Sequence, residues 1–315
     1  MIEYSIVIRT LGTAGEKYLA LLNSIKKLNI QPKEILVVLP EGYNPPKERL
    51  GYEKFVYSSK GMVAQRIFGG QMAKYKYILF LDDDVTFGAD FIEKLSYPIE
   101  SGLCAVTVPA PVQLPPEKGL TKIIPSITMS AVSLKKNKGY FTRIIRSGGW
   151  TYSRYNIEHR PYLYTHSASG ICCLCLNNIF KLINFDEDLW LQGVKYPLWE
   201  DQVMYYKFWK KGYKVMCVPQ AEIEHLDAGG NSAGRAKDAA FASGRNKVIF
   251  WYKYIYKDEK SIFYKVLDKI CLFYHLYSNV LFSWIADFRK NLQYKTASSY
   301  LKGMKEGFRF IHDNE

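Results

Sequence analysis

An uninterrupted apolar run at residues 77–81, Tyr-Ile-Leu-Phe-Leu, leads directly into three aspartates, Asp82, Asp83 and Asp84. Such a run predicts a strand buried on both faces, as found in parallel α/β sheets. Carboxylates at the carboxyl end of that strand lie where open α/β sheets bind ligands. Three neighbouring anions repel one another, and a divalent cation that also takes phosphate oxygens would relieve the repulsion. At this point the triplet fits either a metal site or a solvated acidic turn.

Strand and helix patterns alternate over the first 110 residues. The strand patterns cover residues 5–9, 34–39, 54–58, 77–81 and 104–109, and the helix patterns cover 16–28, 61–73 and 89–100. Strands that alternate with helices predict an α/β fold: a Rossmann-like, mostly parallel sheet flanked by helices and joined by right-handed crossovers.

The rest of the chain departs from this rhythm. Residues 111–165 contain five prolines and a lysine-rich stretch, which predict a long insertion. Regular patterns return at 169–176, 199–210 and 213–218, and the pattern is helical from residue 234 onward. We therefore expect one domain at 1–233 and a helical C-terminal region at 234–315.

Positive charge is concentrated in the insertion. The formal net charge is +13, and residues 115–160 hold nine Lys and Arg against two Glu, a net +7. A local basic field predicts an anionic partner, such as a phosphorylated ligand or an anionic membrane face. Because no helix-turn-helix, zinc-finger or RNA-binding pattern is present, we do not expect a nucleic-acid partner.

Residues 270–286 carry no formal charge and are flanked by Lys265, Lys269, Arg289 and Lys290. The stretch is short and polar for a membrane-spanning helix, and its aromatic residues fit a helix lying in the membrane interface or one packed on the domain. Both of these interpretations stay open. The N-terminus has no signal-peptide pattern, and Cys172, Cys173 and Cys175 lie on a strand pattern where alternating side chains make a poor zinc cage. We expect a cytoplasmic protein without a disulfide framework.

A second acidic pair, Glu200 and Asp201, opens a helix pattern directly after Trp199. Acidic residues at a helix N-terminus are also explained by simple capping. Further along, His225 follows a strand pattern. A single histidine is usually structural, but one that follows two acidic motifs is a better candidate ligand of a metal or phosphate.

Together these motifs resemble one family. In chain order they are residues 4–10, 61–69, 77–84, 185–187, 200–201 and 245–246. Their order and spacing, from residue 1 to about 250, are similar to the family 2 glycosyltransferases, inverting nucleotide-sugar enzymes of the GT-A fold. The resemblance implies a nucleotide-sugar half at about 1–110 and an acceptor half at about 111–233 of the catalytic domain. It also implies a hexosyltransferase-type enzyme whose Asp-X-Asp motif binds Mn²⁺ or Mg²⁺.

The resemblance implies the following roles around the metal. Asp84 would ligate Mn²⁺ or Mg²⁺, Asp82 would contact the metal or the ribose, and His225 would complete the metal or phosphate site. Asp83 would support the donor site from the other face of the strand end. Asp201 would be the general base that takes the proton from the acceptor hydroxyl.

The same resemblance places Arg9 and Thr10 along the base or ribose pocket and Arg66 on the nucleotide. It places Glu200 on hydroxyls of the acceptor or the donor. Trp199, beside the acidic pair, is a candidate platform for the acceptor sugar, although core packing explains it equally well. Where the family commonly has Asp-Asp-Gly-Ser after its second strand, this chain has Pro40-Glu41-Gly42. Glu41 is the candidate substitute, and the nucleobase stays open.

The expected reaction is the transfer of a sugar from a nucleoside-diphosphate sugar to a glycan or lipid-linked acceptor, in polysaccharide biosynthesis. The basic insertion and the aromatic C-terminal region predict a peripheral location at the inner face of the membrane. Two alternatives are a nucleotidyltransferase and a non-enzymatic basic peripheral membrane protein. Against the first, this chain lacks the Gly-rich phosphate loop that such enzymes usually have after the first strand. The second leaves both acidic motifs unexplained.

Overall fold

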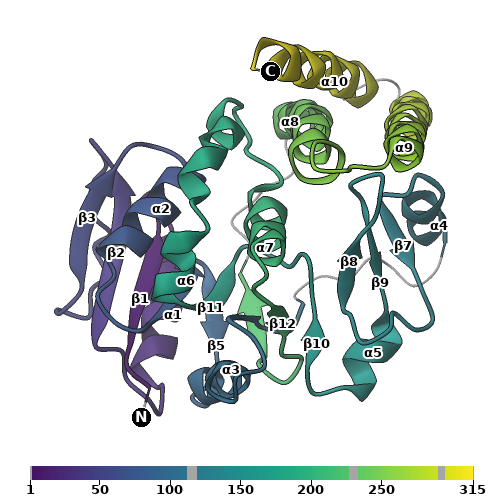
Figure 1. Ribbon diagram of the computed structural model, residues 1–315. Coiled ribbons are helices and arrows are strands. Elements are labelled where there is room, and N and C mark those ends of the chain that lie inside the picture. Colours follow the sequence, from purple (N-terminus) through teal and green to yellow (C-terminus); the bar gives the residue numbers. More distant parts are fainter. Residues whose placement is uncertain (1, 112–118, 227–232, 290–294, 315) are drawn as a thin grey trace. The chain divides into compact units, whose positions relative to one another are not determined.

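The computed structural model describes residues 2–111, 119–226, 233–289 and 295–314. By its internal contacts the chain forms two compact units, traced in Figure 1. Unit 1 comprises residues 1–113, 157–190 and 200–229, and unit 2 comprises 114–156, 191–199 and 230–315. These units do not follow the expected division at residue 233, because two earlier segments group with the C-terminal helices.

Unit 1 is built on an eight-stranded sheet with the order β10-β12-β6-β11-β4-β1-β2-β3. Its strands are β1 (Tyr4–Arg9), β2 (Glu34–Pro40), β3 (Lys54–Ser58), β4 (Tyr77–Asp82), β6 (Val106–Val108), β10 (Leu163–Tyr164), β11 (Cys172–Leu176) and β12 (Val215–Cys217). Only β10 and β11 run antiparallel to their neighbours. A smaller two-stranded sheet joins β5 (Val85–Phe87) to β13 (Ile223–His225). The predicted fold class, a mostly parallel sheet flanked by helices, is confirmed.

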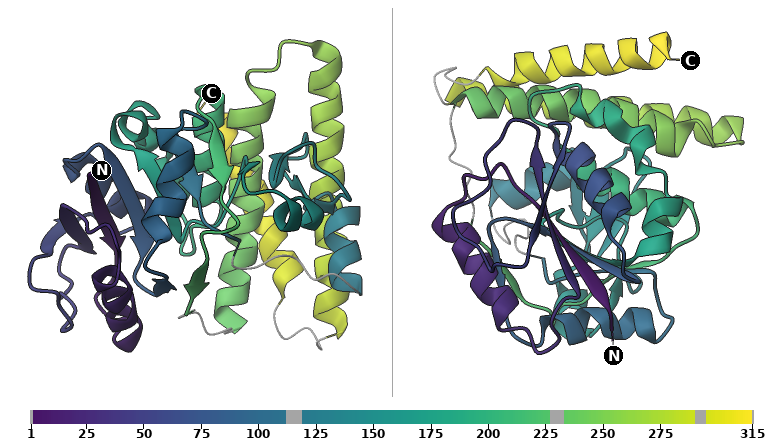
Figure 2. Two further views of the ribbon diagram at one scale, coloured as in Figure 1. Left: turned by 90° about the horizontal axis from the view of Figure 1, so that it is seen from below. Right: turned by 90° about the vertical axis from the view of Figure 1, so that its left-hand side faces the viewer.

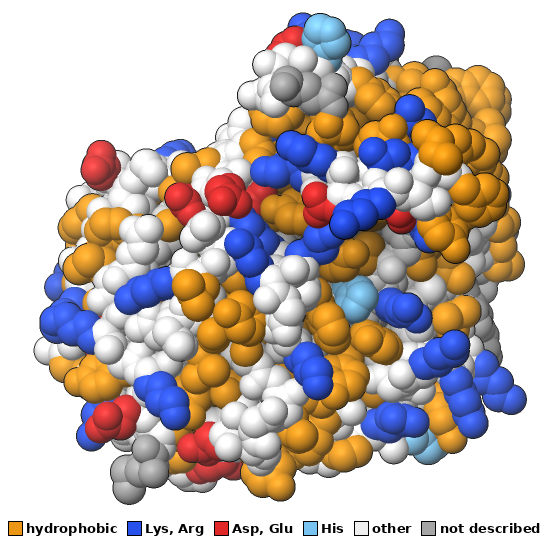
Figure 3. Space-filling view, in the orientation of Figure 1, with side chains coloured by type: hydrophobic (Ala, Val, Ile, Leu, Met, Phe, Trp, Pro, Cys, Tyr) orange, Lys and Arg blue, Asp and Glu red, His pale blue; other side chains and the backbone are white. Residues whose placement is uncertain are grey.

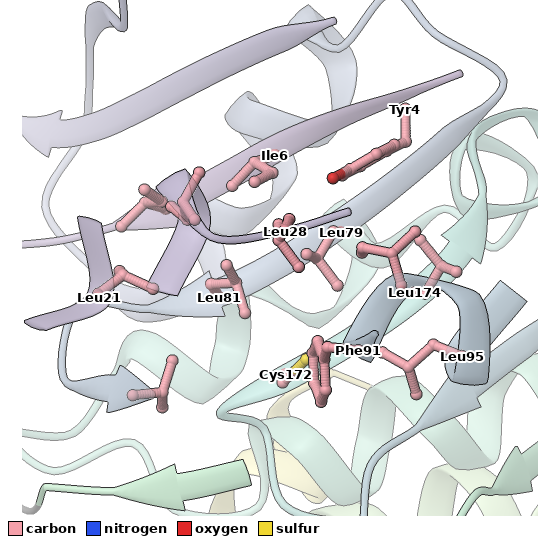
Figure 4. Packing of buried hydrophobic residues seen from close by; sticks show 14 of the residues in the cluster. Tyr4, Ile6, Leu21, Leu28, Leu79, Leu81, Phe91, Leu95, Cys172 and Leu174 are labelled. Carbon is pink, nitrogen blue, oxygen red and sulfur yellow. The ribbon is translucent and has the colours of Figure 1, made fainter. Parts of the chain in front are cut away.

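Helices cover both faces of this sheet. They are α1 (Glu16–Lys26), α2 (Met62–Met72), α3 (Phe91–Glu100), α6 (Asn177–Leu182) and α7 (Glu200–Lys210), with a 3-10 helix, η1 (Phe185–Gln192), before α7. Apolar residues of α1 and α3 pack on side chains from the central strands to form the main core, part of which is drawn in Figure 4. On the other face, a β-carbon at Gly69 of α2 would lie 2.3 Å from Val7 Cγ1, so this helix needs glycine to approach β1.

The central strands end in register, and this positions the polar residues that follow them. Arg9 of β1 lies opposite Asp82 of β4. On the other side of β1, Arg9 lies opposite Val38 of β2. Since parallel strands present their carboxyl ends at one edge of a sheet, this pairing gathers the residues after 77–81 beside those after residue 9.

Unit 2 contains more regular structure than a long insertion predicts. Its strands β7 (Ala131–Ser133), β8 (Thr142–Ile144) and β9 (Trp150–Tyr152) form a sheet in the order β7-β9-β8. Its helices are α4 (Leu120–Ile127), α8 (Ala233–Trp251), α9 (Ile262–Arg289) and α10 (Thr296–Asp313). Helix α8 continues directly into a π-helical turn, η2 (Tyr252–Tyr256). A short helix, α5 (Arg154–His159), lies at the boundary of the two units. The predicted helical C-terminal region is confirmed.

Helices α8 and α10 of unit 2 pack along one another, and α9 contacts both, as Figure 2 shows. Glycines make the close approach of α8 and α10 possible. A β-carbon at Gly303 of α10 would lie 2.0 Å from the carbonyl oxygen of Phe241, and one at Gly244 of α8 would lie 2.4 Å from the carbonyl oxygen of Tyr300. Neither position tolerates a side chain without separation of the two helices.

The uncharged stretch 270–286 lies within α9. None of the helices in the described part of the chain has the length and apolar content needed to cross a bilayer. One side of α9 packs on unit 2 through Leu272 and Leu276, which are fully buried. The other side exposes a row of large apolar side chains.

Candidate functional site

Arg9 joins three elements of unit 1. Its guanidinium donates from Nε to Asp82 Oδ1 at 2.5 Å and from Nη2 to Asp82 Oδ2 at 3.1 Å. Its Nη1 donates to Glu200 Oε1 at 2.7 Å, across 191 positions of sequence. Although burial opposes it, the charges of Asp82 and Glu200 raise the pKa of Arg9 well above its usual value. Arg9 therefore ties the ends of β1 and β4 to the first residue of α7.

Arg66 of α2 reaches the same carboxylate from another direction. Its side chain is only 2% exposed, and it donates from Nη1 to Glu200 Oε2 and from Nη2 to the carbonyl oxygen of Gly170 at 2.6 Å. A β-carbon at Gly170 would lie 3.0 Å from Glu200 Oε1 and 3.1 Å from Asp201 Cβ. Glycine at this position thus leaves the space in which the arginine and the two carboxyls converge.

Two adjacent carboxyls at the start of α7 have opposite pKa shifts. Burial raises the pKa of Glu200, but the charges of Arg66 and Arg9 outweigh it and leave that pKa below its usual value. Burial, with the neighbouring charge of Glu200, raises the pKa of Asp201 to about 6. Asp201 Oδ1 accepts a hydrogen bond from the backbone N–H of Gln202 at 2.8 Å. Carboxyls whose environments push their pKa values apart are typical of acid–base sites.

The residue after β1 is held against the middle aspartate. The hydroxyl of Thr10 donates to Asp83 Oδ2 at 2.5 Å, and Gln65 Nε2 donates to the carbonyl oxygen of Thr10 at 3.0 Å. Burial raises the pKa of Asp83 to about 6. The hydrogen bond from Thr10 acts to lower this pKa, and the charges of Asp84 and Asp82 act to raise it. Asp83 is therefore directed at β1, and Asp82 is directed at Arg9.

The third aspartate faces the predicted histidine. Strands β5 and β13 pair, and His225 Nε2 lies 3.1 Å from Asp84 Oδ1, while the backbone N–H of Leu226 donates to the Asp84 carbonyl at 2.8 Å. Asp82, the other predicted ligand, is held by Arg9. Within the described ranges, no three His, Cys, Asp or Glu side chains gather as a cation site. The residues present thus offer two converging ligands, a carboxylate and an imidazole.

The two remaining predicted residues lie elsewhere. Glu41 follows β2 and is exposed. Trp199 belongs to unit 2, where its ring centroid is 5.9 Å from that of Phe250 and 3.9 Å from Lys247 Nζ. Its φ of 82° is rare for a bulky residue and marks a sharp change of chain direction immediately before α7.

Sequence reasoning missed Gly170 and Gln65. The carbonyl of Gly170 accepts from both arginines, with Arg9 Nη2 at 3.4 Å, and the buried Gln65 amide bonds the end of β1. A buried polar residue directly before Arg66 was a signal for Gln65, since such side chains need partners. Nothing in the sequence marks Gly170, because its role is to accept through its backbone.

A model of the family described as glycosyl transferase family 2 matches residues 50–168, a stretch that includes Arg66 and the three aspartates. The predicted family resemblance is confirmed. The family 2 match supports a glycosyltransferase that uses a nucleotide sugar. No curated protein matches the chain.

The chain is also similar to solved structures, TarS and GalNAc-T7 among them. TarS from S. aureus, residues 1–349, is 13% identical, with a TM-score of 0.50 over 96% of this chain and 81% of that one. GalNAc-T7, solved with UDP, GalNAc and Mn²⁺, is 17% identical, with a TM-score of 0.49 over 80% of this chain. This chain spans 50% of the length of GalNAc-T7. At these identities the likeness to TarS shows the fold alone.

Proposed function

We propose that the protein is an inverting glycosyltransferase that moves a hexosyl residue from a nucleoside-diphosphate sugar to an acceptor hydroxyl. The observation that carries the proposal is the pair at the start of α7. Glu200 is held as an anion by two arginines, and its charge helps to raise the pKa of the adjacent Asp201 to about 6. Such a carboxyl is ionised at neutral pH and is a stronger base than an ordinary aspartate.

Asp201 acts as the general base in this proposal. Its carboxylate takes the proton from the acceptor hydroxyl as that oxygen bonds to the anomeric carbon and the bond to the nucleoside diphosphate breaks. One displacement inverts the anomeric configuration and needs no enzyme nucleophile. In this proposal Glu200 sets the charge beside Asp201, because both of its oxygens accept from arginine. Its predicted contact with the acceptor stays a prediction.

The ends of β1 and β4 form the donor side. Arg9 lies in register with Asp82 there, the hydroxyl of Thr10 donates to Asp83, and Arg66 approaches from α2. In the proposal these residues hold the ribose and the base, with Glu41 at the rim of the base pocket. The bonds from Arg9 and Arg66 to carboxylates fix the two arginines before a donor arrives, which lowers the cost of ordering them on binding.

We further propose Mn²⁺ or Mg²⁺ as cofactor. Asp84 and His225 would hold the ion, since their side chains already converge, and phosphate oxygens of the donor would supply further ligands. Asp82 would join them only by leaving Arg9. When bound, the ion would neutralise the diphosphate that departs. The residues fit this group, because a buried carboxylate paired with an imidazole is a suitable site for Mn²⁺.

The proposed acceptor is a lipid-linked or cell-surface glycan precursor, and the proposed location is the cytoplasmic face of a membrane. The support is the charge of unit 2. It contains 24 Lys and Arg against 9 Asp and Glu, a net +15, whereas unit 1 contains 19 against 21, a net −2. A strongly basic unit attracts phosphate groups and anionic lipid headgroups.

Calorimetric titration with UDP, dTDP and GDP, in Mn²⁺ and in chelator, tests the donor site. We expect metal-dependent binding of one nucleotide, and Asp84→Ala should lose the metal dependence. Absence of binding by all three would reject the donor site.

Asp201→Asn tests the base. It should keep nucleotide binding and slow transfer about 10²- to 10⁴-fold. Asp90→Asn, which changes an exposed carboxyl in the same unit, is the matched control and should match the wild type. Equal loss of binding and transfer in Asp201→Asn would contradict the assignment.

A further inference from the structure

Helix α9 exposes an unusual number of large apolar side chains. Twelve of them are at least 39% exposed on this one helix. They are Ile262, Phe263, Tyr264, Val266, Ile270, Phe273, Tyr274, Tyr277, Leu281, Trp284, Ile285 and Phe288. Single exposed apolar residues are common on protein surfaces, but a contiguous set marks an interaction site. Figure 3 shows such side chains gathered at the right-hand edge of the view, where α9 lies in Figure 1.

These side chains form a continuous stripe along the helix. Phe263, Ile270, Tyr277 and Trp284 recur every seven residues, and so lie on nearly the same side. Their exposures are 69%, 60%, 58% and 58%. The opposite side of α9 is used for folding, because Leu272 packs in the core of unit 2. The four side chains of this row therefore stay largely exposed after the helix has packed on the rest of unit 2.

Helix α4 widens the stripe. Its Ile123 and Ile127 are 50% and 45% exposed. The hydroxyl of Tyr274 on α9 donates to the carbonyl oxygen of Ile127 at 2.9 Å, and His275 Nδ1 lies 2.7 Å from the carbonyl oxygen of Thr128. These bonds fix the end of α4 against α9. We call the twelve residues of α9 with Ile123 and Ile127 the apolar face.

The charges of α9 are sorted by sign. Both of its carboxylates are buried and paired: Asp268 accepts from Arg146 at 2.7 Å, and Asp287 accepts from the hydroxyl of Thr296 at 2.7 Å. The cations Lys269 and Arg289, in contrast, are exposed. Along α9 the apolar face is thus bordered by positive charge without negative charge, in a unit of net +15.

We propose that the apolar face docks onto a bilayer that contains anionic lipid, with α9 lying in the plane of the headgroups. Tyr, Trp and Phe side chains suit the boundary of headgroup and acyl chain, and Lys and Arg reach anionic headgroups. Helix α9 does not have the length and apolar content needed to cross the bilayer. A second copy is a poorer occupant, because two units of net +15 repel each other, whereas an anionic surface attracts one. The inference rests on the proposed membrane location and not on the transfer chemistry.

Vesicle co-sedimentation of the full chain tests the proposal. We expect binding to phosphatidylcholine vesicles that contain about 30% phosphatidylglycerol, and weaker binding to phosphatidylcholine alone. Leu281→Asp should lower the partition coefficient at least tenfold, about 1.4 kcal/mol, since it places an anion in the apolar face. The matched control is Leu182→Asp in unit 1, where the leucine is also 54% exposed, and it should bind like the wild type.

Two further measurements make the outcomes decisive. Asp201→Asn should bind vesicles like the wild type, so loss of transfer and loss of docking are separable. Failure of the wild type to bind anionic vesicles, or equal binding by Leu281→Asp and Leu182→Asp, would overturn the proposal. So would a dimer in light scattering that Leu281→Asp converts to a monomer, because the face would then belong to a second copy.

Discussion

The two units of this chain differ in net charge and in how their charged side chains are placed. Unit 1 is nearly neutral, at 19 basic against 21 acidic residues, and buries ionic groups around Glu200. Unit 2 has 24 basic against 9 acidic residues, so its cations far outnumber its anions. Paired, buried charge fixes side chains in one geometry, and unpaired surface charge attracts a partner. This difference is why we place the proposed chemistry in unit 1 and the proposed attachment in unit 2.

The largest effect is expected from Arg66→Met in unit 1. The side chain is 2% exposed and pairs with Glu200, so its removal leaves a buried anion with one arginine fewer. We expect a loss of about 3–5 kcal/mol in the free energy of unfolding, as for other broken buried pairs. Urea unfolding of the full chain measures it.

The counterpart in unit 2 is Lys195→Met. Lys195 is 83% exposed and lies 2.9 Å from Asp238. Exposed pairs of this kind contribute little. The urea midpoint should therefore match the wild type. Similar losses for the two variants would break the contrast between the units.

Gly303→Ala should give the next largest effect, this time in unit 2. The new β-carbon would lie 2.0 Å from the carbonyl oxygen of Phe241, so α10 must move away from α8. Overpacking of this kind costs about 1–3 kcal/mol. Thermal unfolding should show the loss, and calorimetry should show nucleotide binding intact. Gly88→Ala is the control, because its nearest neighbour, Asp90 Oδ1, is 3.6 Å away. Loss of nucleotide binding in Gly303→Ala would contradict a donor site that is confined to unit 1.

A third prediction concerns pH and Asp201 alone. Because its pKa is raised to about 6, the carboxyl is protonated below that pH and cannot take the proton of the acceptor hydroxyl. Transfer under saturating substrates should rise about tenfold per pH unit below 6 and level off above it. The folded state also binds this proton more tightly than the unfolded chain does. Asp201 therefore lowers stability as pH rises from about 4 to 6. Asp201→Asn should raise the free energy of unfolding at pH 7, measured in urea. A rate that falls between pH 5 and 7 would contradict this role.

The sequence predicted the parts of unit 1 that depend on local order. The run at 77–81 and the aspartates after it appear as β4 and the turn into β5, and the alternation of strands and helices gives the parallel sheet. It did not predict the contact of Arg9 with Glu200, because 191 positions separate them and no periodicity connects them. Nor did it predict that two arginines hold Glu200, since an acidic residue looks alike in sequence whatever its partner. The grouping of 114–156 with the C-terminal helices was hidden in the same way.

A small effect, opposite in sign to that of Arg66→Met, is expected from Lys247→Met in unit 2. Like Arg66 this cation is buried, at 1% exposure, but its Nζ has no hydrogen-bond partner among the described residues and lies 3.9 Å from the ring of Trp199. Burial lowers its pKa well below the usual value. The unfolded chain then binds a proton that the folded chain releases, so this lysine makes folding more favourable as pH rises toward about 10.4.

Lys247→Met removes the cost of burying the amine. We expect equal or slightly higher stability at pH 7 and a flatter dependence of the urea midpoint on pH. A loss as large as that of Arg66→Met would mean that Lys247 is paired in solution, and that unit 2 also depends on buried charge.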